Sequence, residues 1–156
     1  MYNVFKIVNW LRVRNNNDMR FNPIVDELSQ MRAMKLLYYI QAMSLSITGR
    51  RMFDNDIVAR KYGPVVEEVH EKYRGHRGIV GEITESDLND YSDLQSDYKA
   101  SSILNSTYDV YGYSSAYDLM SQIHSEKPWQ DTPQSEVISD QAIKDYYSGV
   151  FVYDED

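Results

Sequence analysis

The stretch SQMRAMKLLYYIQAMSLSITG, Ser29–Gly49, decides the fold. Apolar residues recur along it at steps of three and four, which is the spacing of one helix face, at Met31, Met34, Leu37, Tyr38 and Leu45. Three further apolar residues extend this stripe almost all the way round, namely Leu36, Ile40 and Met43. Ser29 can cap the N-terminus of such a helix, and Gly49 can end it. The sequence therefore predicts a central, buried helix.

Segments on both sides predict further, shorter helices. Val4–Leu11 has helical spacing, and the turn-prone run Asn15–Asp18 is expected to end it. Capping residues, prolines and apolar spacing predict the other helices at residues 23–28, 54–61, 64–75, 84–94, 100–111, 115–124 and 139–149. The glycine-punctuated, β-branched segment 76–83 is the candidate for a strand. We therefore predict a mainly α fold, a single compact helical domain over residues 1–150 with at most a small β-hairpin or strand near residues 76–83, and an acidic tail over residues 151–156.

Length, charge and cysteine content narrow the classes of protein that fit. The 156 residues carry a formal net charge of −8, which disfavours nucleic-acid phosphates over most of the surface. Arg50, Arg51, Arg60 and Lys61 form either a small basic patch or separate surface charges. Cysteine is absent, so disulfides and cysteine metal cages are excluded. No segment approaches the ~18 apolar residues of a membrane span, and the N-terminus lacks a signal-peptide pattern, so we expect a cytoplasmic protein.

No motif indicates catalysis, a cofactor or a metal. Gly75, Gly78 and Gly81 lack the order of a nucleotide-binding glycine loop. The three histidines do not form a pair on one helix face, and His124 with Glu126 would still need further ligands to hold zinc. Acidic residues are plentiful, but no pair stands out as a general acid and base. We therefore expect no catalytic, cofactor-binding or metal-binding residues.

The Tyr62-Gly63-Pro64 break between two predicted helices is either a binding turn or a structural corner. Glycine tolerates a left-handed backbone and can end a helix, and proline can begin the next one. Glutamates follow directly at positions 67, 68 and 71, and their charge disfavours a phosphate site. We therefore expect a corner that sets the angle between two helices. Tyr62 and the Val65/Val66 face are expected to pack on the Lys35–Tyr39 helix and the Pro128–Trp129 loop.

Four motifs in order resemble the Panacea domain, a phage-associated family of GepA-like and SocA-like antitoxins. A Lys-Leu-Leu-Tyr-Tyr helix is matched by Lys35–Tyr39, followed by Gln41. Phe53, with Met52, Ile57 and Ala59, matches the second motif, and Tyr62–Val65 match a Tyr-Gly-Pro-Val motif. The last motif is matched by Leu119, His124, Pro128 and Trp129. The signature positions are Lys35, Leu36, Leu37, Tyr38, Gln41, Phe53, Tyr62, Gly63, Pro64, Val65, His124, Pro128 and Trp129.

The resemblance extends over most of the chain, from Val4 to Tyr147, with one departure. The family commonly places tryptophan where Arg60 stands, so the packing role of that aromatic is open here. The chain also carries no appended helix-turn-helix or zinc module, so direct binding to nucleic acid is not expected.

What the resemblance implies is an antitoxin that neutralises a cognate protein toxin by direct contact. Such a toxin is usually encoded by an adjacent gene, and the chain would be bacterial or prophage-encoded. The implied protein is not an enzyme, needs no cofactor and binds no membrane. One alternative is a proteolytic adaptor that delivers a bound partner to a protease through the Val152–Asp156 tail. A second alternative is an uncharacterised phage-associated enzyme.

Overall fold

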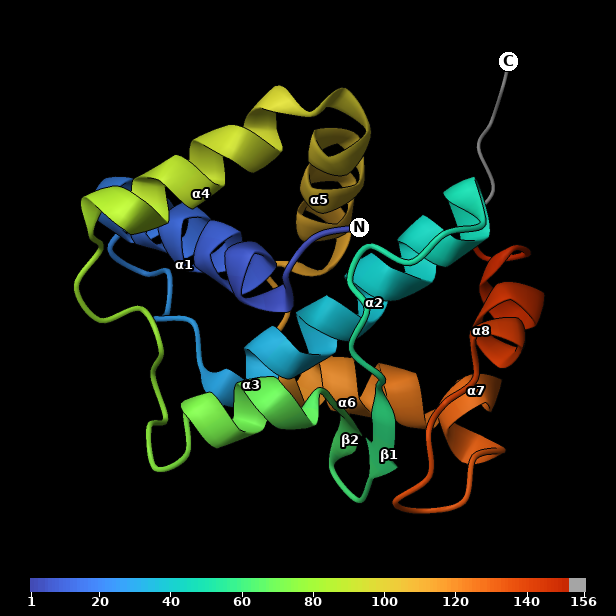
Figure 1. The fold of residues 1–156 in the computed structure, drawn as a ribbon. Helices are drawn as coiled ribbons and strands as arrows, with labels where there is room; N and C mark the ends of the chain where they lie inside the picture. The colour runs from blue at the N-terminus through green and yellow to red at the C-terminus, as the bar shows by residue number, and fades with distance from the viewer. Residues whose placement is uncertain (152–156) are drawn as a thin grey trace.

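The structure is a computed structural model that describes residues 1–151. These residues form eight helices and one small antiparallel sheet (Figure 1). The elements are α1 (Val4–Phe21), α2 (Gln30–Thr48), β1 (Val58–Arg60), β2 (Gly63–Val65), α3 (Glu67–Lys72), α4 (Glu85–Ser96), α5 (Tyr98–Tyr111), α6 (Ala116–His124), α7 (Lys127–Gln130) and α8 (Asp140–Tyr147). The predicted mainly α fold is confirmed. Of the predicted acidic tail, residues 152–156 lie outside the described residues.

Helix α2 crosses the middle of the molecule, as its sequence predicts. Helices α1, α4 and α5 lie on one side of it, and the hairpin, α6, α7 and α8 lie on the other (Figure 1). Every residue of α2 from Arg32 to Leu45 is buried. Ser29 accepts a hydrogen bond from the backbone N–H of Arg32, and Gly49 ends the helix at a φ of 74°. Both predicted caps are confirmed.

Helix α1 is longer than predicted, because the buried side chain of Asn15 bonds to the backbone of a later segment from within the helix. The run Asn15–Asp18 was expected to end the helix, but the helix continues to Phe21. The side chain of Asn15 is fully buried; its oxygen accepts a hydrogen bond from the N–H of Leu28 and its nitrogen donates one to the carbonyl of Asp26. These bonds hold residues 22–28 as a turn and an extended segment, so the helix predicted there is wrong.

The helix predicted over residues 54–61 is also wrong, and the one predicted from Pro64 exists but begins later, because residues 58–65 form a β-hairpin. Val58 pairs with Val65, Ala59 with Pro64, and Arg60 with Gly63, and α3 begins only at Glu67. The outer edge of β1 pairs as well: the N–H of Ala59 donates to the carbonyl of Glu136 at 2.9 Å. Contacts distant in sequence therefore override the local helical signal. Residues 76–83, the predicted strand, form a loop with one isolated bridge, between Ser29 and Gly78.

A buried cluster of tyrosines around Glu126 joins three parts of the chain. The Tyr39 hydroxyl donates to the Glu126 carboxylate at 2.7 Å, and the Tyr147 hydroxyl donates to the same oxygen at 2.8 Å. The Tyr38 hydroxyl lies 2.9 Å from that of Tyr147. Burial raises the pKa of all three phenols. Helix α2, the start of α7 and helix α8 are thus held together by hydrogen bonds inside the core, where such bonds are costly to lose.

The Tyr147 hydroxyl should contribute measurably to stability. We expect Tyr147→Phe to lower the free energy of unfolding by about 2 kcal/mol, because it removes one donor from the buried Glu126 carboxylate. Urea denaturation measures this change. Tyr98→Phe is the matched control, because Tyr98 is 86% exposed and its change should stay within about 0.5 kcal/mol. Equal denaturation midpoints for the two variants would contradict a structural role for the cluster.

Gly63 should tolerate no β-branched residue. Its φ of 119° is one that side chains with a Cβ rarely adopt, so we expect Gly63→Val to lower stability by about 2 kcal/mol or more. Gly149→Val is the control, since Gly149 does not have a positive φ and a Cβ there would meet nothing nearer than 3.8 Å. Thermal melts compare the two variants. A Gly63→Val melting temperature equal to that of the unsubstituted protein would show that this turn does not constrain the fold.

Candidate functional site

A groove opens between the first turns of α2, the β1–β2 hairpin and α3. Its volume is about 440 Å³. The sequence folds this way locally because Gly63 lets the hairpin turn back towards α2, and Val66 and Val69 then anchor the start of α3 in the core. The groove is lined by Gln30, Met31, Met34, Lys35, Arg60, Tyr62, Pro64, Val65, Glu67, His70 and Arg74. It therefore combines apolar walls with charged residues.

The apolar walls of the groove include large side chains that solvent reaches. Tyr62 is 59% exposed and Met31 is 49% exposed. Val65 is half-buried and Pro64 is buried. Exposed aromatic and methionine side chains beside a hollow are typical of surfaces that bind other proteins. Tyr62 and the Val65/Val66 face were expected to pack against the Lys35–Tyr39 helix and the Pro128–Trp129 loop; Val66 is buried, but the expectation is wrong for Tyr62, because the hairpin turn leaves its ring exposed.

The rim of the groove carries charges that already have partners. The guanidinium of Arg60 donates to Glu67 at 2.9 Å and to the hydroxyl of Ser135 at 3.0 Å. Arg74 pairs with Glu71 at 2.8 Å in the same region. The family that the sequence resembles commonly has tryptophan at the position of Arg60. In this chain Arg60 joins the hairpin to the start of α3. The sequence places Arg60 and Glu67 on either side of the turn, but it does not show that they pair, because the hairpin is not evident from the sequence.

Lys35 lies at the floor of the groove. Its side chain is almost fully buried, at 2% exposure of the residue, and its Cε lies 3.5 Å from the position that a Cβ on residue 63 would occupy. The ammonium donates one long hydrogen bond, 3.4 Å, to the carbonyl of Met31. Burial lowers the pKa of Lys35 below its ordinary value. The buried charge is therefore only weakly compensated.

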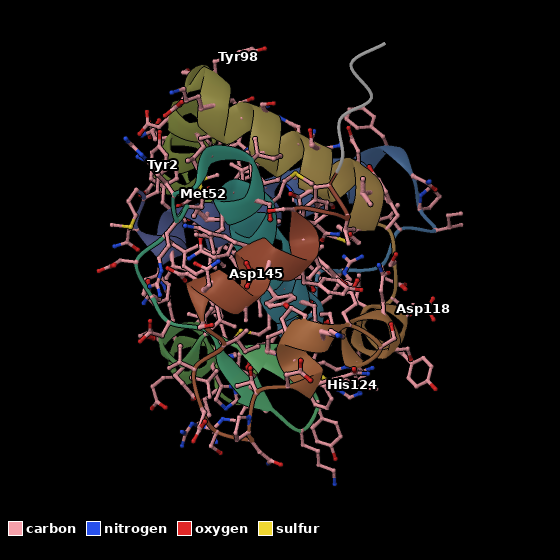
Figure 2. The ribbon with its side chains drawn as sticks, turned by 90° about the vertical axis from the view of Figure 1, so that its right-hand side faces the viewer. Tyr2, Met52, Tyr98, Asp118, His124 and Asp145 are labelled. Carbon is pink, nitrogen blue, oxygen red and sulfur yellow. The ribbon has the colours of Figure 1, made fainter. Side chains whose placement is uncertain are left out.

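His124 and Trp129 support the hairpin from behind. His124 ends α6, beside the hairpin (Figure 2), and its ring stacks on that of Trp129 with a centroid separation of 3.9 Å. The indole N–H of Trp129 donates to the carbonyl of Arg60 at 2.9 Å. The Nε2 of His124 is buried and finds no hydrogen-bond partner within residues 1–151. Burial, and then the charge of Lys35, lower the pKa of His124.

The signature positions fall into groups that differ in location. Leu36, Leu37 and Phe53 are fully buried in the core, and Tyr38 belongs to the tyrosine cluster. Gln41 is buried and holds the loop after α2, because its amide donates to the carbonyl of Phe53 at 2.8 Å and accepts from the N–H of Met52 at 2.7 Å. Lys35, Tyr62, Pro64 and Val65 line the groove, His124 and Trp129 support the hairpin, and Pro128 is buried in α7. The structure thus separates positions that build the fold from positions that line the groove.

Sequence reasoning missed Met31, Glu67 and Glu126 as parts of these two sites. Met31 was placed on the buried stripe of α2, but it lies at the open end of the helix, where the hairpin does not cover it. Glu126 was considered only with His124, as an incomplete zinc site, and nothing in its sequence spacing indicates the tyrosines that bind it. Among residues 1–151, no three His, Cys, Asp or Glu side chains are grouped so that they could hold a metal ion. Nor is any helix in this range long and apolar enough to cross a membrane. The arrangement suits the binding of a protein segment.

Comparison with known proteins gives a family match. The family model described as antitoxin SocA-like, Panacea domain, matches residues 34–130, which is more than half of the chain. The matched range includes α2 from Met34 onward, the hairpin and the His124–Trp129 support. No curated protein and no solved structure matches the chain.

Protonation of His124 should weaken the fold. Because the pKa of His124 in the folded chain lies below its ordinary value of 6.5, the unfolded chain takes up this proton first, so stability falls as the pH drops below that value. We expect the free energy of unfolding to fall more steeply between pH 7.5 and 5.5 in the unsubstituted protein than in His124→Phe, which keeps the stacked ring. Denaturant titrations at several pH values measure the two slopes. Parallel slopes would contradict the low pKa.

Proposed function

This chain belongs to the SocA-like Panacea family of antitoxins, and on that premise we propose that it neutralises a cognate protein toxin by direct binding. The toxin would be encoded by an adjacent gene and would be met in the cytoplasm of a bacterial or prophage-carrying cell. Binding that covers the toxin's active site would be a sufficient mechanism. The family match supports the antitoxin role, and the groove supports the mode of binding.

The observation that carries this proposal is the groove beside the exposed Tyr62. Tyrosine offers a large apolar ring with a hydroxyl that remains able to hydrogen bond, and such residues often dominate the affinity of protein interfaces. Met31 adds a flexible apolar side chain next to it, which suits a surface that adapts to its partner. Both side chains stand on elements held rigidly by the core, so little ordering is needed when a partner binds.

The groove would form the centre of a larger interface. Stable complexes bury at least about 1,000 Å² in total, which is more than one groove of this volume supplies. The chain as a whole carries a net charge of −8, and this charge would steer a basic partner towards it. A toxin whose overall surface is basic would therefore meet the antitoxin quickly and be held by apolar contacts at the groove.

Co-expression with the product of the adjacent gene tests the proposed function. We expect that product alone to stop bacterial growth and the unsubstituted chain to restore it. Tyr62→Ala should weaken binding by about tenfold or more and reduce the rescue, because truncation of an interface anchor typically costs over 1 kcal/mol. Tyr98→Ala is the matched control, since Tyr98 is 86% exposed at the end of the molecule opposite the hairpin (Figure 2).

The same co-expression experiment distinguishes the antitoxin function from the alternative functions. A harmless gene product, or equal rescue by both tyrosine variants together with unchanged binding, would contradict the proposal. A toxin whose half-life shortens in the presence of the chain would instead favour the adaptor, and removal of residues 152–156, which lie outside the described residues, would test the tail's part in it.

A further inference from the structure

We propose that the groove binds an acidic side chain of the toxin, with Lys35 as its counterion and the apolar walls contacting the large apolar residues next to that acid. This inference rests on the proposed function and deepens it, since it names the chemistry that the partner segment must have. It also runs against the overall charge of the chain, because it assigns an acidic segment to a protein that is itself acidic.

The first argument is the incomplete bonding of Lys35. An ammonium group has three N–H donors, and this one donates only a single hydrogen bond of 3.4 Å, to the carbonyl of Met31. Within residues 1–151, no Asp or Glu forms an ion pair with it. Buried charges are usually paired, because removing an isolated charge from water costs much free energy. An almost fully buried lysine that lines a groove thus lacks the anion that its surroundings would normally supply.

The second argument is that the nearby acids are already engaged. Glu67 is bound by Arg60 across the rim, and Glu71 is bound by Arg74. His124 carries no negative charge, and its pKa is lowered first by burial and then by the charge of Lys35. The acids of the rim are therefore held by other cations, and a carboxylate brought by a partner would meet an ammonium with free donors.

The third argument is the shape and lining of the groove. Lys35 lies at the floor beneath Gly63, so a carboxylate that reaches it must extend inward from a chain that rests on the rim. Tyr62, Pro64 and Val65 line one wall, and Met31 and Met34 line another. These walls fit the apolar neighbours of an acidic side chain better than a fully charged segment. The occupant is therefore a toxin segment in which Asp or Glu stands next to large apolar residues.

Short peptides test the site without the toxin. The probe is N-acetyl-Leu-Glu-Leu-amide, added to the ¹⁵N-labelled full chain, and its matched control is the peptide with Gln in place of Glu. We expect the Glu peptide to shift the backbone signals of Gly63 and Val65 with a dissociation constant on the order of 1 mM, and the Gln peptide to leave them unchanged. Equal shifts from the two peptides, or none from either, would overturn the proposal. N-acetyl-Leu-Gln-Leu with a free carboxyl end, if it alone bound, would assign the site to a chain terminus and overturn it likewise.

Two lysine variants connect the site to the toxin. Lys35→Met keeps the length and apolar stem of the side chain and should leave the melting temperature unchanged or raised, because a well-packed apolar residue replaces a poorly compensated charge. It should nevertheless abolish the peptide shifts and weaken toxin binding about 30-fold or more, as measured by calorimetry. Lys99→Met, on the exposed start of α5, is the matched control and should change neither quantity.

The outcomes separate this inference from the proposed function. Toxin binding that is equally strong in Lys35→Met and the unsubstituted chain would overturn the inference and leave the antitoxin role intact. Peptide binding without any toxin binding would overturn the proposed function and, with it, the assignment of the occupant to a toxin, and would leave only the acid-binding site at Lys35. A chain that lacks residues 152–156 provides the last check: if the Lys35 ammonium signal moves when Asp154, Glu155 and Asp156 are removed, the chain's own tail is the occupant and the partner assignment is overturned.

Discussion

The burial of α2 on all sides is the constraint on which the rest of the structure depends. A helix that is apolar around its whole circumference must be covered by other elements on every face. Its polar side chains must then find partners inside the core, because an unsatisfied buried polar group costs about 1–3 kcal/mol. Gln41 is satisfied by the loop after α2, and Tyr39 is satisfied by Glu126. Each of these bonds ties a distant segment to the same helix, so the polar residues of α2 help to determine how the fold closes around it.

Local signals predicted the parts of the fold that local interactions determine. Ser29 and Gly49 cap α2 as expected, and Thr84 with Asp87 forms a capping box at the start of α4, where the sequence predicts a helix. The errors arose where distant contacts decide. Asn15 belongs to a helix because its side chain satisfies backbone groups near residue 28, eleven or more positions along the chain. Residues 58–65 form a hairpin, and β1 also pairs with the segment around Glu136, which lies too far along the chain for a local sequence pattern to include it.

Several residues of the candidate site were predictable from the sequence, but the shape of the site was not. The Tyr-Gly-Pro-Val motif and Lys35 stand out in the sequence, yet their spacing predicts a corner between two helices and no groove. The hairpin turns Tyr62 out to solvent and brings Gly63 over Lys35, and both effects depend on the φ of 119° at Gly63. The ion pair between Arg60 and Glu67 could not be predicted from the sequence either, because it depends on the turn of the hairpin.

The weakly compensated charge of Lys35 has a physical consequence for binding. A lysine on the open surface must give up its hydration when it pairs with a carboxylate, and this cost cancels much of the attraction, so exposed ion pairs contribute little. The ammonium of Lys35 has already lost most of its water on folding, as its 2% exposure shows, and the cost has been met by the stability of the fold. When a carboxylate enters the groove, binding therefore costs the desolvation of the carboxylate but not that of the ammonium. The attraction between the two charges is also stronger in the groove than in water. Lys35 destabilises the core of the free protein, and for the same reason it is well suited to bind an acidic group.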